Sequence, residues 1–187
     1  EKIEKIIEEL NELVGNEEKN RVEIEEERDR FREIKKQLLA HRHTYGPAAN
    51  RLEQLLEETE TIFTLYSDAT ENGNYMEARE HVLKIKDNLK DVRSKMDKIP
   101  ELLAEINISA PNQIAELKDG YKEMMEQGYI LSHVNFDKEM EQIEKQLAVY
   151  KEYINAAEVE EAELGMNELK GSLSALYDVF EKEVDAR

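Results

Sequence analysis

The sequence contains no cysteine and no tryptophan, and only three of its 187 residues are proline and seven glycine. The absence of cysteine excludes disulfides and Cys-ligated zinc, and it fits a reducing compartment. Because turn-forming residues are few and no alternating apolar run is bounded by turns, we expect no strands. Charged residues make up 37% of the chain. This composition is typical of long helices with solvated outer faces.

Positive charge is also scarce, since 26 Lys and Arg residues stand against 44 Asp and Glu residues and the net charge is −18. Such a field repels nucleic acid and anionic lipid, so we expect neither as a direct partner of this chain. The acidic surface is interpreted as a solvated helical face or, alternatively, as a surface that meets a basic protein.

Long apolar runs are missing as well. None approaches the ~18 residues that a membrane span needs, and no signal peptide is visible. The chain starts and ends inside helical patterns, at Glu1 and Arg187. We therefore expect it to be a piece of a longer protein.

One stretch of the chain, residues 74–100, recurs in related form as residues 158–184. The apolar positions of the two copies coincide and are three or four residues apart, which places them on one stripe of a helix. The paired residues are Ala78 and Ala162, Val82 and Met166, Ile85 and Leu169, Leu89 and Leu173, Val92 and Leu176, and Met96 and Phe180. The preceding helix recurs too, with Leu56 on Met140, Phe63 on Leu147 and Tyr66 on Tyr150. A recurring pair of helices predicts a repeated helical module.

The repeat predicts an all-α fold of two tandem, antiparallel three-helix bundles, elongated and resembling spectrin repeats, because short connections force neighbouring helices to run antiparallel. The first repeat is expected over residues 1–98, with helices at about 1–44, 47–72 and 74–98. The second is expected over residues 99–187, with helices at about 100–128, 135–156 and 158–187.

Glycine and proline mark the predicted helix ends. Gly46–Pro47 separates the first two helices, and Gly73 fits a left-handed position after the second. Pro100 is expected to kink or interrupt its helix, and residues 107–111 are expected to break it, with Ser109 as a cap. Whether the first helix continues through Gly15–Asn16 stays open.

The first helix carries a heptad pattern, which allows an alternative architecture. One seam position reads Ile3, Leu10, Glu17, Ile24, Phe31, Leu38 and Tyr45, and the other reads Ile6, Leu13, Asn20, Glu27, Ile34 and His41. If this seam paired between chains, the protein would be a dimeric coiled-coil tether. The polar residues Glu17, Asn20 and Glu27 in the seam argue against a long two-stranded coil.

Catalytic and metal-binding patterns are missing. No Gly-rich phosphate loop, HExxH motif or nucleophile elbow occurs. None of the four histidines, His41, His43, His81 and His133, follows a glutamate at the Glu-x-x-His spacing of di-iron bundles. On a helix, His41 and His43 would point about 200° apart and could not share an ion. We expect no enzyme, no cofactor and no metal site.

Residues 99–133 carry a resemblance to a known family. The matching positions are Pro100, Leu102, Leu103, Pro111, Gln113, Leu117, Gly120, Tyr121, Glu123, Met124, Gly128, Tyr129 and His133. Two earlier stretches agree, LLAHRHTYGPA at residues 38–48 and GNYMEA at residues 73–78. The chain resembles the EzrA family, the septation ring formation regulators of low-GC Gram-positive bacteria.

The resemblance implies a function that composition and periodicity do not supply. EzrA-like proteins have one N-terminal membrane span followed by a cytoplasmic arc of spectrin-like repeats. They restrain assembly of the tubulin-like protein FtsZ and coordinate the division ring with cell-wall synthesis at the septum. This chain matches an interior part of the arc, since it lacks the span and the family's C-terminal glutamine-asparagine-arginine patch. We therefore expect a monomeric, cytoplasmic scaffold segment without membrane contact, whose partners are FtsZ and other division proteins.

The candidate contact for a partner is the exposed part of residues 118–133. Its residues are Lys118, Tyr121, Glu123, Tyr129 and His133. In the competing interpretation, Gly120 and Gly128 permit close helix packing or a turn, and the two tyrosines fill the junction between repeats. Packing is favoured, because aromatic residues at helical spacing usually belong to the core.

Overall fold

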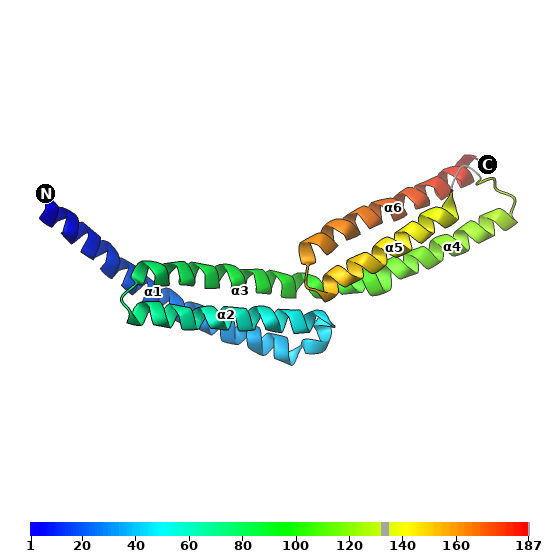
Figure 1. The fold of residues 1–187 in the computed structure, drawn as a ribbon. Coiled ribbons are helices and arrows are strands. Elements are labelled where there is room, and N and C mark those ends of the chain that lie inside the picture. Colours follow the sequence, from blue (N-terminus) through cyan, green and yellow to red (C-terminus); the bar gives the residue numbers. More distant parts are fainter. Residues whose placement is uncertain (132–134, 187) are drawn as a thin grey trace. The chain divides into compact units, whose positions relative to one another are not determined.

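The computed structural model describes residues 1–131 and 135–186, and within these residues the chain is helical, with no strand. The predicted all-α class is confirmed. In chain order the elements are α1 (Lys2–Ala40), η1 (Arg42–Tyr45), α2 (Ala48–Glu71), α3 (Tyr75–Ala104), η2 (Glu105–Ser109), α4 (Ala110–Glu126), α5 (Phe136–Asn155) and α6 (Val159–Ala186). Figure 1 labels the α-helices. Of the two short elements, η1 is a 3-10 helix and η2 is π-helical.

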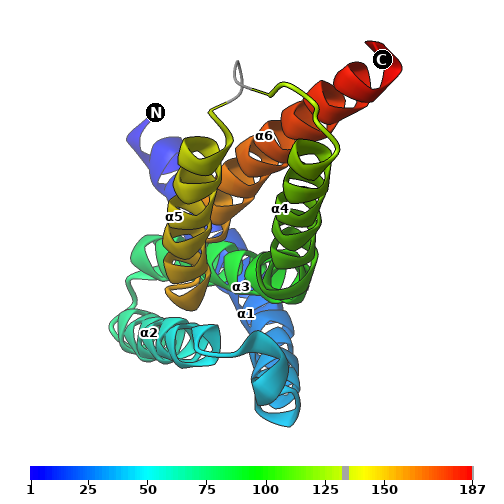
Figure 2. The same ribbon diagram turned by 90° about the vertical axis from the view of Figure 1, so that its right-hand side faces the viewer.

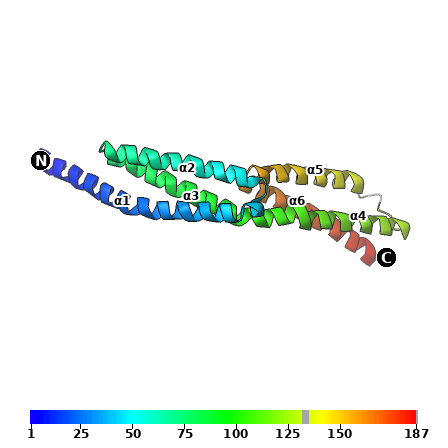
Figure 3. The ribbon, with the colours of Figure 1, turned by 90° about the horizontal axis from the view of Figure 1, so that it is seen from below.

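The chain divides into two compact units, Glu1–Asp97 (unit 1) and Lys98–Arg187 (unit 2), and the boundary falls inside α3. In unit 1, α1, α2 and the first part of α3 lie side by side (Figures 1 and 3). In unit 2, α6 packs against both α4 and α5, and the three helices are seen together in Figure 2.

The predicted apolar stripes form the cores of the two units. Every stripe residue of α3 and α6 is buried, from Ala78 to Met96 in α3 and from Ala162 to Phe180 in α6. In α2, Leu52, Leu56, Thr59 and Tyr66 are buried. Half-buried Phe63 packs edge-on against Phe31 of α1, with 5.6 Å between ring centroids. The periodicity therefore predicted the inward faces correctly.

Two turns of the same type join the last two helices of each unit. At the end of α2, Gly73 takes a left-handed φ of 76°, and the Asn74 amide donates to the Ala69 carbonyl oxygen at 2.8 Å. At the end of α5, Ala157 has a φ of 59°, and the Glu158 amide donates to the Tyr153 carbonyl oxygen at 2.8 Å. Both are Schellman closures, which confirms the left-handed position predicted for Gly73.

The chain is more continuously helical than the sequence predicts. The helix α3 continues through Pro100 to Ala104, and the expected break at residues 107–111 is wrong, because η2 leads directly into α4. The π-helical turn occupies residues 105–109, where the backbone would otherwise meet the Pro111 ring, and such a turn lets a helix continue past a proline. Ser109 has helical φ and ψ and its side chain makes no capping hydrogen bond, so its predicted role is also wrong. α1 runs unbroken through residues 15–16.

Candidate interaction surfaces

Lys118 and Tyr121, two residues of the predicted contact, lie together on α4 beside α5. The Lys118 ammonium forms an ion pair with Glu144 of α5. Lys118 and Tyr121 line a shallow groove of about 350 Å3, whose other residues are Phe136, Asp137, Met140, Glu141 and Glu144. Three carboxylates against one lysine make this groove acidic, which suits a basic group on a partner.

Tyr121 also has a packing role. Its ring stacks on Phe136 of α5, with 4.2 Å between centroids and 10° between the planes. The same ring lies 6.3 Å from Phe180 of α6. Since Phe136 and Phe180 are both buried, Tyr121 links α4 to the two other helices of unit 2.

Glu123 and Tyr129 do not line this groove. Glu123 is exposed on α4, whereas Tyr129 is half-buried after the helix end. The chain turns at Gly128, which has a left-handed φ of 86°. His133 lies outside the described residues. The structure therefore brings together Lys118 and Tyr121 and places Glu123 and Tyr129 apart from that groove.

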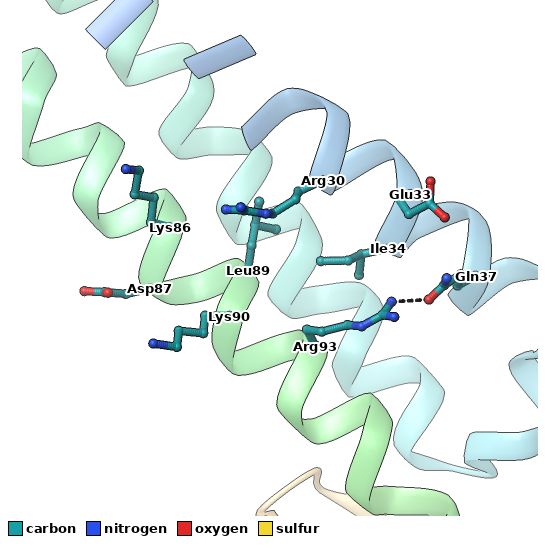
Figure 4. A pocket seen from close by; sticks show the side chains of 9 residues that line it. All are labelled: Arg30, Glu33, Ile34, Gln37, Lys86, Asp87, Leu89, Lys90 and Arg93. Atoms are coloured by element: carbon teal, nitrogen blue, oxygen red, sulfur yellow. Dashed lines mark hydrogen bonds between the residues drawn. The ribbon is translucent and has the colours of Figure 1, made fainter. Parts of the chain in front are cut away.

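A larger groove lies in unit 1, between α1 and α3, and the sequence analysis did not find it (Figure 4). Its volume is about 700 Å3. Ile34 of α1 and Leu89 of α3 form its floor, and both are buried. The polar residues around them are Arg30, Glu33 and Gln37 from α1, and Lys86, Asp87, Lys90 and Arg93 from α3. Figure 4 shows the hydrogen bond that Arg93 donates to Gln37 between the two helices.

Two glutamates of α1 that do not line this groove are ion-paired with cations that do, Glu23 with Lys86 and Glu27 with Arg30. Glu23 accepts hydrogen bonds from Arg79 and is ion-paired with Lys86 at 2.9 Å. Burial raises the pKa of Glu23, but the interactions with Arg79 and Lys86 outweigh burial, so that its pKa is below the ordinary value. Glu27 is fully buried, and burial raises its pKa more than Arg30 lowers it. Glu23 is therefore a well-paired carboxylate and Glu27 a poorly paired one, and each lies against a cation that lines the groove.

Within residues 1–131 and 135–186, no group of three or more His, Asp or Glu side chains could hold a metal ion. In the same ranges, no helix combines the length and the apolar character needed to cross a bilayer.

All 187 residues match the model of a single protein family, described as septation ring formation regulator, EzrA. The chain belongs to the EzrA family. The predicted resemblance is thus confirmed, and with it a place among bacterial septation regulators.

Curated relatives of this EzrA-family chain carry the name septation ring formation regulator EzrA. One from Geobacillus sp. is 46% identical over 98% of this chain and 32% of its own length. Another from Bacillus subtilis is 39% identical over 98% of this chain and 33% of its own length. A third, from Staphylococcus epidermidis, is 34% identical over 84% of this chain. The chain thus spans about a third of the length of the Geobacillus and Bacillus subtilis relatives. No solved structure matches it.

Proposed function

We propose that this chain is a non-catalytic helical scaffold within a cell-division regulator. In the whole protein it restrains assembly of the FtsZ ring and positions other division proteins. The observation that carries this proposal is the match of the entire chain to the family of septation ring formation regulators. The two compact helical units support it, because packed helices hold binding surfaces at defined positions along a chain.

In this proposal, the two units are spectrin-type triple-helix repeats. The first uses α1, α2 and the first part of α3, and the second uses the remaining helices. The scaffold acts on the cytoplasmic side of the cell membrane, at the division septum. Its surface charge supports this role, because 44 acidic residues keep the helical faces soluble and disfavour direct contact with anionic lipid.

The partner contact proposed for this function remains the segment with Lys118, Tyr121, Glu123, Tyr129 and His133. The acidic groove beside Lys118 and Tyr121 supports it, since this groove offers the half-buried Tyr121 and three carboxylates to a partner.

Co-pelleting with polymerised FtsZ tests the function. We expect the chain to sediment with GTP-assembled filaments at low salt and to be released at high salt, because salt screens contacts between exposed charges. A sample without GTP controls for sedimentation that does not depend on filaments. If the folded chain stays in the supernatant at both salt concentrations, this segment does not contact FtsZ.

The proposed contact is tested by a matched pair of charge reversals. Glu123→Lys changes an exposed residue of the proposed segment, and Glu181→Lys makes the same change at an exposed residue of α6. We expect only Glu123→Lys to alter co-pelleting. Equal effects of both variants would assign binding to the general charge of the chain instead of this segment.

The alternative function is a spacer or dimeric coiled-coil tether with no direct FtsZ contact. The exposed apolar residues near the start of α1 favour it, since such a stripe can pair with another helix. Absence of co-pelleting from a folded chain would favour this alternative.

A further inference from the structure

We propose that the groove between α1 and α3 of unit 1 binds an acidic amphipathic helix of a partner protein. The groove has an apolar floor of Ile34 and Leu89 and a volume of about 700 Å3. Ile34 and Leu89 are themselves buried, so the apolar surface that a partner helix could cover here is the aliphatic stems of the lysines and arginines that lie over them. This inference concerns the chemistry of the groove and does not depend on the FtsZ contact proposed above.

The charge around this groove is opposite to that of the chain as a whole. Four cations, Arg30, Lys86, Lys90 and Arg93, line it together with two carboxylates, those of Glu33 and Asp87. Three other grooves of the described surface each contain one lysine and three carboxylates. Their charged residues are Lys35, Glu53, Glu57 and Glu60; Glu18, Lys19, Glu23 and Glu26; and Lys118, Asp137, Glu141 and Glu144. A cationic groove in a chain of net charge −18 is therefore a local feature that selects an acidic partner.

The cations differ in how far they are already neutralised. Arg30 is ion-paired with Glu27 at 2.6 Å, and Lys86 with Glu23 at 2.9 Å. Arg93 donates to the neutral amide of Gln37 and lies 3.9 Å from Asp97. Lys90 makes no ion pair or hydrogen bond within the described part of the chain. Lys90 and Arg93 therefore have the most positive charge left for a partner.

The spacing of these cations fits a helical occupant. Lys86, Lys90 and Arg93 follow one another at intervals of four and three residues on α3, so that they span about 10 Å along one side of the helix. Carboxylates on a second helix recur at the same intervals. Nucleic acid would also meet these cations, but the remaining acidic surface repels a polyanion of that length.

Fluorescence anisotropy with designed peptides tests the proposal. The probe is a fluorescein-labelled helical peptide of about 18 residues with Leu on one face and Glu beside it. One companion peptide has Lys in place of each Glu, and another has Ser in place of each Leu. We expect saturable binding of the Leu and Glu peptide alone, and at least about tenfold weaker binding to the double variant Lys90→Glu, Arg93→Glu.

A matched double variant controls for overall charge. Lys84→Glu, Lys122→Glu makes the same change in net charge at exposed positions outside the groove, and it should bind the peptide as the unaltered chain does. Circular dichroism establishes that both double variants are folded. Equal weakening by both would show that binding follows general charge, and the proposal would then be wrong.

Amide chemical shifts locate the peptide on the unaltered chain and so do not depend on any variant. We expect shifts concentrated in residues 30–37 and 86–93. Shifts elsewhere, or no saturable binding up to about 1 mM peptide, would overturn the proposal. Concentration-dependent dimerisation that the Lys90→Glu, Arg93→Glu variant abolishes would assign the groove to a second copy of this chain, and would also overturn it.

Discussion

Glu27 places a carboxyl group in the core of unit 1, where its side chain is 0% exposed. Oε1 accepts from Arg30 Nη1 at 2.6 Å, whereas Oε2 has no hydrogen-bond partner among the described residues. A buried charge of this kind pays a desolvation cost that one partner does not fully offset. Apolar residues of similar volume are often more stable at such positions.

We predict that Glu27→Leu raises the free energy of unfolding by about 1 kcal/mol at pH 7. Urea denaturation followed by circular dichroism measures the change. Glu26→Leu is the matched control, because Glu26 is the exposed neighbour and should leave stability nearly unchanged. A less stable Glu27→Leu variant would mean that the Arg30 ion pair outweighs the cost of burying the carboxylate.

The effect of Glu27 on stability should depend on pH. Because its pKa is raised in the folded state, the folded protein holds this proton more tightly than the unfolded chain does. At a pH below its unfolded pKa, Glu27 is protonated in both states and does not destabilise the fold through its charge. As pH rises from there through the folded pKa, ionisation of the buried carboxyl lowers the free energy of unfolding. Relative to the non-titrating Glu27→Gln variant, the unaltered chain should lose stability over that window. A constant difference between the two would contradict the raised pKa.

Glu23 contributes a pH dependence of stability of opposite sign. Because Glu23 is present in both the unaltered chain and the Glu27→Gln variant, the difference in stability between these two proteins isolates the effect of Glu27. The lowered pKa of Glu23 gives stability that is present above its unfolded pKa and lost as pH falls through the folded one. The sequence placed Glu27 in the heptad seam but could not show these charges around it. Arg79 and Lys86 of α3 approach α1 only after folding, which is also why the cationic groove escaped prediction.

At the scale of the element, α5 and α6 approach closely at Gly165. A β-carbon at this position would lie 2.2 Å from Tyr150 Cε1, so that the buried tyrosine ring would have to move. We predict that Gly165→Ala lowers the free energy of unfolding by about 1–3 kcal/mol. Thermal unfolding of the variant measures this.

Gly171 provides the control in the same helix. Outside the local backbone of its own helix, nothing described lies within 4 Å of a β-carbon built there, and the residue is exposed. Gly171→Ala should therefore raise stability by up to about 1 kcal/mol, because alanine favours a helix over glycine. If Gly165→Ala were stabilising as well, α5 and α6 would not be in close contact at this point.

The apolar stripes of α3 and α6 allow a second test at this scale. Leu89 and Leu173 are buried and equivalent in the repeat, and an unpaired aspartate at either position should cost about 3 kcal/mol or more. Leu83→Asp and Leu164→Asp introduce the same charge at exposed positions of the same helices and should cost little. Thermal midpoints that fall equally in all four variants would refute the assigned core faces.

The same stripes explain which elements were predictable. Apolar residues that recur every three or four positions are visible in the sequence, so the inward faces of α3 and α6 were predicted correctly. The prediction of a helix break near the prolines was wrong because it considered only the effect of proline on its own helix and not the packing around it. Pro100 costs roughly 3 kcal/mol in a helix interior. Around it, however, Ile99, Leu102, Ile106 and Ala110 are all buried, and their burial favours a continued helix.

At the scale of the whole molecule, unit 1 uses most of the heptad seam for its own core. Ile24, Ile34 and Leu38 are buried within the chain, and the Asn20 amide donates to the Tyr75 carbonyl oxygen of α3 at 3.1 Å. Most of the large apolar residues that α1 leaves exposed lie near its start. They are Ile3, Ile6, Ile7, Leu10 and Val14, and only Val22 and Leu39 are exposed further along the described helix. This stretch covers less than the roughly three heptads that a stable coiled coil needs.

We therefore predict that the chain is a monomer of 21.9 kDa in sedimentation equilibrium, even at a high protein concentration. Pairing through residue 20 and beyond would require α1 to leave α2 and α3, which would expose the core of unit 1. A variant with Ile6→Asp and Leu10→Asp serves as the control, and it should sediment as the unaltered chain does. If the unaltered protein sedimented at twice the mass of one chain and the Ile6→Asp, Leu10→Asp variant at the mass of a single chain, the coiled-coil tether would be established instead. In that case the exposed residues of α1 would suffice for pairing, although they cover so few heptads.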